Sequence, residues 1–340
     1  MHPLAVLFAA VVPVAAALAS MPAVALGQGG SDTVRGDDVF FLDNVSQDAA
    51  PQGPTDETIT IHTIATGRDR EIFRPKLGKI FDFRVAPTSA MIAVTEQVRK
   101  FDVDPQLATT VINGHPTFER TVLYIVDRDG NQIDQVEGGV RSFAWSPDGE
   151  QLAYVTGDYK NTEGVYGNTK AWIWGRDKSR RQISGDIHDK VSWAAFDDNI
   201  YLWERTATGA YGAVLRYNVS ANRLERTSHK GIFFSPTGTY YFHPGGGYRE
   251  NVYLRATDTV IKSQVISELA AWRPIAWARD SDFLLMEAMK GPNDPVEQAV
   301  FDPVNDSAID LRLGQSFMWG QDSTEIVVKN GDRYEKRRIR

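Results

Sequence analysis

Apolar and polar positions alternate in one sequence motif, called the phrase below, that recurs six times along the chain. The phrase is clearest over residues 143–154, where the aromatic anchor Trp145 precedes a polar turn and a run of alternating apolar residues. A two-residue period is typical of a strand with one buried face. The six anchors are Val85, Trp145, Trp193, Phe234, Trp277 and Trp319. Seven residues after them the chain is apolar in every copy, at Ile92, Leu152, Ile200, Tyr241, Leu284 and Ile326.

A turn separates each anchor from the next strand. Ser146–Gly149 and Ser235–Gly238 both place Pro second and Gly fourth, which suits a type I β-turn. A second hairpin follows the first five phrases, for example Val122–Val126 with Gln132–Val136. The sixth copy of this second hairpin, Thr58–Phe73, precedes the first phrase instead of following the last one. Each phrase together with one second hairpin therefore predicts a unit of four strands.

The spacing of the anchors indicates how these units are arranged. Successive anchors are 60, 48, 41, 43 and 42 residues apart, and a period near 42 built from short strands is typical of propeller blades. The pattern predicts an all-β fold: a six-bladed β-propeller of four-stranded antiparallel blades over residues 57–340. Because the hairpin Thr58–Phe73 is displaced, we expect it to complete the last blade, begun by Phe317–Val328, and so to close the ring.

The N-terminal residues have a different composition. Residues 3–27 carry no charge, Leu4–Leu18 is apolar, and Ala17–Ala19 and Ala23–Ala25 are small-x-small sites. This predicts a cleaved signal peptide over residues 1–27 and a periplasmic or secreted protein without a membrane span. The alternative is an uncleaved N-terminal anchor, because about 20 apolar residues can cross a bilayer.

Residues 28–56 are rich in Gly, Asp, Gln and Pro, which predicts a flexible acidic leader with one short strand, Asp38–Leu42. The whole chain has a formal net charge of −7, which argues against nucleic acid as a partner. It has no cysteine, which excludes disulfides, thiolate catalysis and cysteine-bound zinc.

The repeated phrase resembles that of a known family. The Ser146–Gly149 turn, together with strands such as residues 59–68 (ITIHTIATGR), resembles the repeat of TolB-type periplasmic propellers, which are relatives of the WD-repeat family. The resemblance covers residues 57–340 and implies a TolB-like propeller. TolB carries an additional α/β domain before its propeller, and the 29-residue leader here is too short to encode one. The resemblance therefore implies no role in the Tol system.

Catalytic signatures are absent from the sequence, which contains no nucleophile elbow, P-loop, dinucleotide fingerprint or HExxH motif. We therefore predict no catalytic residue and no cofactor. Four histidines, His115, His188, His229 and His243, map to the loops that we expect on one face of the propeller. Histidine clusters bind metals, and TolB-like repeats also occur in oligogalacturonate lyases, which use a histidine-rich metal site. The favoured alternative is that His188 and His229 join loops to strands by hydrogen bonds and that His243 is a hydrogen-bonded residue at the end of a strand.

Two long connections are candidate binding surfaces, the insertion Gln97–Glu119 and the loop Asp158–Asn168, because recognition concentrates in long loops on rigid scaffolds. The binding-face candidates are Tyr159, Glu163, Tyr166 and Tyr248. The sequence thus predicts an exported propeller that acts as a protein-interaction or ligand-binding module, with another protein or a small ligand on the loop face. The alternative is a propeller enzyme, such as a metal-assisted carbohydrate lyase or hydrolase.

Overall fold

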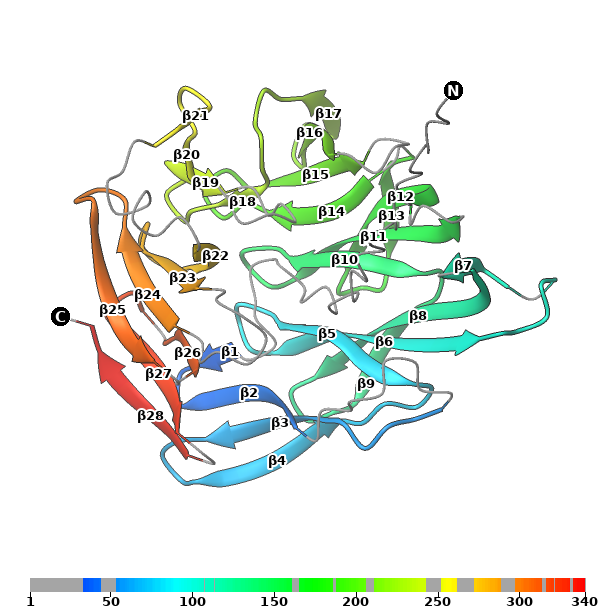
Figure 1. The fold of residues 1–340 in the computed structure, drawn as a ribbon, viewed down its shortest axis with the longest axis horizontal. Coiled ribbons are helices and arrows are strands. Elements are labelled where there is room, and N and C mark those ends of the chain that lie inside the picture. Colours follow the sequence, from blue (N-terminus) through cyan, green and yellow to red (C-terminus); the bar gives the residue numbers. More distant parts are fainter. Residues whose placement is uncertain are drawn as a thin grey trace, which may run out of the picture.

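The structure is a computed structural model in which the described residues are 33–43, 53–106, 108–112, 114–160, 165–185, 188–205, 211–242, 252–261, 272–288, 297–313, 316–320, 322–330 and 333–339. Their regular elements are all strands, arranged in sheets around a ring (Figure 1). None of these residues belongs to a helix with the length and hydropathy that a membrane span requires. The predicted signal peptide, residues 1–27, lies outside the described residues.

The described strands form seven sheets, and each sheet is one blade. Blade 1 contains β1 (Thr33–Arg35), β2 (Asp38–Asp43), β3 (Thr58–Thr63) and β4 (Arg68–Phe73). Blade 2 contains β5 (Lys79–Val85), β6 (Met91–Phe101), β7 (Thr110–Ile112), β8 (His115–Asp127) and β9 (Gln132–Val136). Blade 3 contains β10 (Val140–Trp145), β11 (Gln151–Lys160), β12 (Val165–Gly175) and β13 (Arg180–Ser184).

The remaining four blades follow in chain order. Blade 4 contains β14 (His188–Trp193), β15 (Asn199–Arg205), β16 (Tyr211–Asn218) and β17 (Arg223–Arg226). Blade 5 contains β18 (Phe233–Phe234), β19 (Tyr240–Phe242), β20 (Val252–Leu254) and β21 (Thr259–Val260). Blade 6 contains β22 (Trp272–Trp277), β23 (Leu284–Ala288), β24 (Glu297–Asp302) and β25 (Ser307–Leu313). Blade 7 contains β26 (Ser316–Trp319), β27 (Glu325–Asn330) and β28 (Arg333–Arg338).

The prediction of six blades is wrong, because the hairpin Thr58–Phe73 belongs to a blade of its own. Its strand β3 pairs with β2, which pairs with β1, and none of these strands pairs with blade 7 in the described residues. A two-residue turn joins β1 to β2, so Arg35 lies opposite Asp38. This inner hairpin has neither an aromatic anchor nor a Ser-Pro-Asp-Gly turn, which is why counting anchors missed it. The short strand predicted at Asp38–Leu42 is the second strand of this blade.

The predicted register of the other six blades is confirmed. Each anchor lies on the innermost strand and faces the residue seven positions later, as in the pairs Trp145 with Leu152 and Trp277 with Leu284. The other four anchors pair in the same way. The repeat therefore encodes the inner hairpin of every blade except the first.

The anchors also connect neighbouring blades. The indole N–H of Trp277 donates to the carbonyl oxygen of Phe233 at 3.0 Å, in the preceding blade. Trp145 donates to Arg84 at 2.8 Å, and Trp319 donates to Ala276 at 2.9 Å. Each of these three acceptors directly precedes the anchor of the neighbouring blade, so the same bond recurs at three blade boundaries. The Trp193 indole instead donates at 2.8 Å to Asp198 of its own blade.

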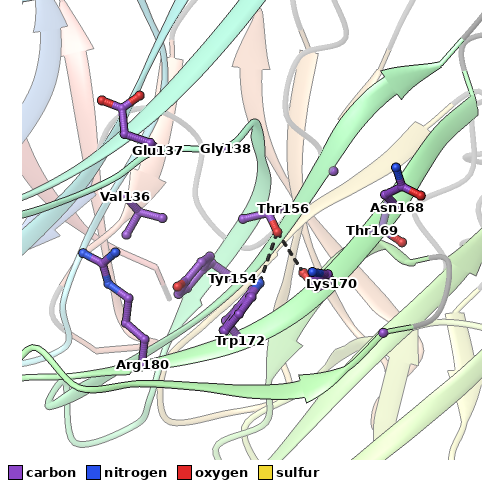
Figure 2. A pocket seen from close by; sticks show the side chains of 12 residues that line it. Val136, Glu137, Gly138, Tyr154, Thr156, Asn168, Thr169, Lys170, Trp172 and Arg180 are labelled. Carbon is purple, nitrogen blue, oxygen red and sulfur yellow. Dashed lines mark hydrogen bonds between the residues drawn. The ribbon is translucent and has the colours of Figure 1, made fainter.

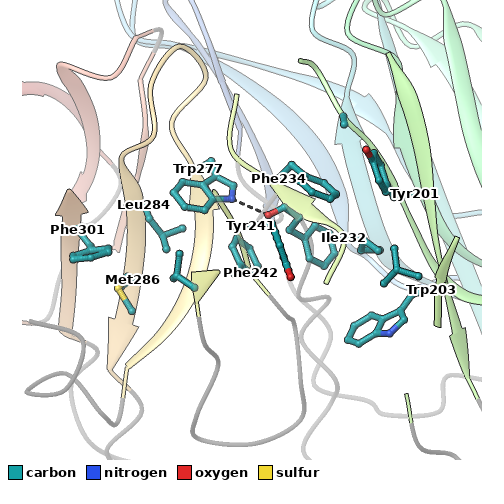
Figure 3. Close-up of a cluster of buried hydrophobic side chains, with 14 residues drawn as sticks. Tyr201, Trp203, Ile232, Phe234, Tyr241, Phe242, Trp277, Leu284, Met286 and Phe301 are labelled. Carbon is teal, nitrogen blue, oxygen red and sulfur yellow. Dashed lines mark hydrogen bonds between the residues drawn. The ribbon is translucent and has the colours of Figure 1, made fainter. Parts of the chain in front are cut away.

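Aromatic rings fill the spaces between blades. Figure 3 shows this packing where blades 4, 5 and 6 meet, with Tyr201 and Phe234 in contact at 4.4 Å between ring centroids. Trp277 packs beside Phe242 at 6.0 Å. Facing sheets lie roughly 10 Å apart, and rings of this size fill that gap.

The ring closes between blade 7 and blade 1 without a shared strand in the described residues. Blue and red strands lie side by side there in Figure 1. A small apolar cluster includes Phe41 of blade 1 and Tyr334 of blade 7. The ammonium of Lys329 lies 5.3 Å from the Phe41 ring centroid, and Lys336 pairs with Asp37 at 2.8 Å. Side-chain packing and ion pairing therefore hold this seam.

Candidate functional site

A pocket of about 590 Å³ opens where the end of blade 2 meets blade 3 (Figure 2). Its walls come from β11 and β12 of blade 3, from the end of β9 and the connection to β10, and from the start of β13 and the residue that follows it. The lining residues are Val136, Glu137, Gly138, Tyr154, Thr156, Gly157, Asn168, Thr169, Lys170, Trp172, Arg180 and Gly185. Asn168 also belongs to the long loop that the sequence marked as a binding surface.

Two aromatic side chains form one wall of the pocket. Tyr154 and Trp172 are directly opposite each other on β11 and β12. Their rings stack with centroids 6.4 Å apart and planes 11° apart. The Trp172 indole donates to Thr156 Oγ1 at 3.1 Å, and Thr156 Oγ1 donates to the Lys170 carbonyl at 3.4 Å. These bonds fix the orientation of the indole, which is only partly buried and so presents apolar surface to the pocket.

The Tyr154 side chain is buried and uncharged. Desolvation raises its pKa to about 12, and its ring is almost fully buried. The phenol is protonated at physiological pH, as an ordinary tyrosine also is, and the Tyr154 ring acts as the packing partner of Trp172.

Arg180 is held at the pocket by an acceptor from blade 2. Its guanidinium donates to Asp134 Oδ2 at 2.9 Å and to the Gln135 carbonyl at 2.8 Å. The indole of Trp174 donates to the same Asp134 oxygen at 2.9 Å. Burial alone would raise the pKa of Asp134, but the hydrogen bonds, led by that from Arg180, lower it below its ordinary value. Asp134 is therefore ionised and neutralises Arg180.

The other charged lining groups differ in their pairing. Glu137 accepts from Arg120 Nε at 3.0 Å and from Gln135 at 2.6 Å, and the bond from Arg120 lowers its pKa. Lys170 is exposed, and its ammonium forms no ion pair with any residue that the structure describes. Lys170 is therefore the cation on this wall that is open to a ligand.

A buried ionic network contacts the lining of the pocket at Gly157. The carboxylate of Glu119, whose side chain is 1% exposed, pairs with Arg99 at 2.9 Å and with Arg141 at 2.8 Å. Arg141 also donates to the carbonyl of Gly157, a lining residue, at 3.3 Å. Gly139 has φ of +70°, and a Cβ there would lie 2.5 Å from the same carbonyl oxygen. This close approach requires glycine and brings the connection from blade 2 against β11.

One of the predicted histidines lies beside the pocket. His188 is buried at the start of β14, and its Nε2 lies 2.6 Å from Ser184 Oγ. Its main-chain N–H donates at 2.7 Å to the hydroxyl of Thr169, which lines the pocket. His188 therefore supports the wall by hydrogen bonding.

Two further predicted histidines, His229 and His115, each have a separate carboxylate partner. His229 Nδ1 lies 2.5 Å from Asp258 Oδ1, in a network that Ser228 and Tyr241 complete. Burial raises the pKa of Asp258, but the hydrogen bonds from Ser228 and His229 outweigh it and lower the pKa below 3.8. His115 is exposed, and its Nδ1 lies 2.8 Å from Asp102.

A metal site at these histidines remains a prediction. His243 lies outside the described residues. Within the described ranges, no three His, Asp or Glu side chains are grouped in a way that could hold a metal ion.

The predicted binding loops have more regular structure than expected. Most of Gln97–Glu119 is a hairpin in which β6 and β8 pair as far as Phe101 and Thr117. Tyr159 and Tyr166 are cross-strand partners where β11 and β12 extend beyond the pocket. The side chains of these two tyrosines, and all of Glu163 and Tyr248, lie outside the described residues.

Sequence reasoning missed most of the pocket. The usable signal is the alternation of Tyr154 with Thr156 and of Lys170 with Trp172, which is typical of two strands that each present polar and aromatic side chains on one face. The contribution from Glu137 of blade 2 arises only when the blades pack together.

Comparison with known proteins yields similarities of structure. No protein-family model and no curated protein matches the chain. TolB from Acinetobacter baumannii is 11% identical, with 83% of this chain and 66% of that chain covered and a TM-score of 0.47. Dipeptidyl peptidase 4 from Porphyromonas gingivalis is 10% identical, with 86% and 47% covered and a TM-score of 0.46. A structure from a study of two prolyl endopeptidases is 13% identical, with 90% and 49% covered and a TM-score of 0.53.

These likenesses concern the fold. The chain spans between about half and two thirds of the length of these solved chains. The seven described sheets confirm the predicted β-propeller, with seven blades in place of six. The described residues form a β-propeller with a pocket between its second and third blades.

Proposed function

We propose that this chain is an exported propeller that binds a ligand, either a small molecule or a projecting segment of another protein, in the pocket between blades 2 and 3. The observation that carries the proposal is the stacked pair Tyr154 and Trp172 beside the unpaired ammonium of Lys170. Binding sites commonly combine aromatic surface with a few fixed polar groups.

The lining defines what kind of ligand fits. An apolar ring or sugar face would stack on the indole of Trp172, because the Thr156 hydroxyl holds that indole in place. An anionic or acceptor group would pair with Lys170. Arg180 and Glu137 already have partners, so they shape the rim and add little net charge.

The proposed compartment is the periplasm or cell envelope. Residues 1–27 have the composition of a signal peptide, and the repeat resembles that of periplasmic TolB-type propellers. Export of the native chain and cleavage after residues 19–27, measured by mass spectrometry of the mature protein, would test this part separately.

Fractionated cell-envelope extract tests the binding proposal. Each fraction is added to the purified chain, and the melting temperature is recorded for the wild type, for Trp172→Ala and for Phe81→Ala. A ligand at one hundred times its Kd stabilises the native state by about 2.7 kcal/mol. Phe81 is the matched control because it is an aromatic side chain that is 42% exposed and lies outside the pocket.

We expect at least one fraction to raise the melting temperature of the wild type and of Phe81→Ala by the same amount, and to leave Trp172→Ala unchanged. Equal stabilisation of all three proteins would place the ligand elsewhere and refute the assignment of this pocket. No stabilisation by any fraction would count against a binding function.

A further inference from the structure

Blade 7 has a sheet edge that no other strand of the described residues covers. Six blades contain four or five described strands, whereas blade 7 contains three, and β28 is its outermost strand (Figure 1). The neighbouring blades fill the fourth position with β25 and β4. Within the described residues, no strand pairs with the outer side of β28.

The register shows which main-chain groups face this edge. Arg338 lies opposite Glu325 on β27, and the N–H of Ile339 donates to the Thr324 carbonyl at 2.8 Å. In an antiparallel ladder, successive residues direct their N–H and C=O groups to opposite sides. The main-chain groups of Lys336 and Arg338 therefore point away from β27, toward the open side.

The charge of this edge is unusual for the chain. Residues 333–340 contain five Lys or Arg and one Glu, although the chain as a whole has a net charge of −7. Lys336 pairs with Asp37 at 2.8 Å and Arg337 with Glu335 at 3.3 Å. Arg333, Arg337 and Arg338 are exposed. The outer strand of the neighbouring blade 1, β4, balances two arginines with an aspartate and a glutamate. An acidic segment is therefore the complement of β28.

We propose that β28 receives an extended acidic segment of a partner protein, which adds as the fourth strand of blade 7. Main-chain hydrogen bonds to Lys336 and Arg338 would supply affinity, and the arginines would select acidic side chains. The chain's own residues 1–32 contain one acidic residue, Asp32, so charge complementarity favours a partner over that segment. This surface is separate from the pocket and does not depend on the function proposed for it.

Fluorescence anisotropy of the full chain with designed peptides tests the proposal. The probe is a labelled, capped peptide in which Val and Glu alternate. The controls are the same peptide with Lys in place of Glu, and a Val-Glu peptide with N-methyl groups on alternate residues. We expect the Val-Glu peptide to bind about ten-fold or more tightly than either control. Equal binding of the N-methylated peptide would show charge attraction without strand pairing and overturn the proposal.

Two variants at Arg338 distinguish the contribution of its main-chain N–H to peptide binding from that of its side chain. Arg338→Pro removes an N–H that faces the open edge and leaves the ladder to β27 intact, because edge strands accept proline there. Arg338→Ala removes the same side chain and keeps the N–H. We expect about ten-fold weaker binding for Arg338→Pro than for Arg338→Ala. Equal affinities of the two variants would overturn the proposal. Should Arg338→Pro fail to fold, the N-methylated peptide decides alone.

Hydrogen exchange of the free chain provides a final check on the edge. We expect the amides of Lys336 and Arg338 to exchange rapidly alone and slowly with the Val-Glu peptide. Charged residues also protect bare edges from pairing. Absence of peptide binding would show that the charged residues of β28 prevent strand pairing at this edge, and would overturn the proposal. Slow exchange without peptide would show that the chain itself covers the edge, and would likewise overturn the proposal.

Discussion

Truncating an anchor tryptophan should weaken the contact between two blades. Trp277 is 6% exposed and lies among side chains of blades 5 and 6, including Phe242 and Leu284. Its indole also satisfies the carbonyl of Phe233 across the blade boundary. Trp277→Ala removes both the packing and the hydrogen bond.

The magnitude follows from these two losses. Replacing a large core aromatic by alanine costs about 3–5 kcal/mol through lost burial and the remaining cavity. Trp277→Phe keeps most of the ring and loses the N–H, so it leaves a buried carbonyl without this donor and should cost about 1–3 kcal/mol. Trp193→Phe is the matched control, because the Trp193 indole donates at 2.8 Å to the carboxylate of exposed Asp198, which water can solvate after the substitution. Its loss of the N–H should cost about 1 kcal/mol or less.

Urea unfolding monitored by fluorescence and far-ultraviolet circular dichroism measures these differences. The expected order of destabilisation is Trp277→Ala, then Trp277→Phe, then Trp193→Phe. A cost below about 1 kcal/mol for Trp277→Ala would refute its role as a core anchor. Equal costs for the two phenylalanine variants would refute the contribution of the cross-blade hydrogen bond.

Four further substitutions test other parts of the fold. Gly238→Ala should destabilise the protein by more than the roughly 1–2 kcal/mol that a positive φ costs, because the added Cβ would lie 2.4 Å from a neighbouring ring atom. Gly67 has open space around it, so Gly67→Ala should cost only the free energy due to its positive φ. Equal melting temperatures of the two variants would contradict this. Glu119→Ala should cost about 3–5 kcal/mol by leaving Arg141 buried without its carboxylate, and urea midpoints check it. Asp258→Asn should destabilise the protein less at pH 3 than at pH 7. The pKa of Asp258 is lowered in the native state, so its carboxylate contributes stability above pH 3.8 that is lost as the pH falls through the native pKa. A pH-independent difference in stability would contradict this.

The sequence predicts a blade wherever the repeat contains an anchor residue that packs between two sheets. An anchor such as Trp145 fills the gap between two sheets and bonds the preceding blade, so its spacing and register appear directly in the chain. Blade 1 lacks that signal. Its innermost strand, Thr33–Arg35, has three residues and reaches β2 through a tight turn in which Gly36 has φ of +63°. Counting anchors therefore gave six blades, and the displaced hairpin was assigned to the wrong sheet.

The pocket could be predicted only in part. Tyr154 and Trp172 belong to one hairpin, so their pairing follows from strand register. Glu137 and Arg180 come together because blade 2 packs on blade 3, and no local pattern encodes that approach. The histidines were grouped by their positions in the repeat, whereas the described ones have separate partners, such as Ser184 for His188.

The most direct test of the binding site is fluorine NMR of the chain labelled with 5-fluorotryptophan. The eight tryptophans give separate resonances that single Trp→Phe variants assign. We expect a stabilising envelope fraction to shift the resonance of Trp172 and to leave that of Trp203, which is fully buried in the core beside blade 5, in place. A fraction that binds and shifts other resonances while that of Trp172 stays unchanged would contradict the assignment of the pocket between blades 2 and 3.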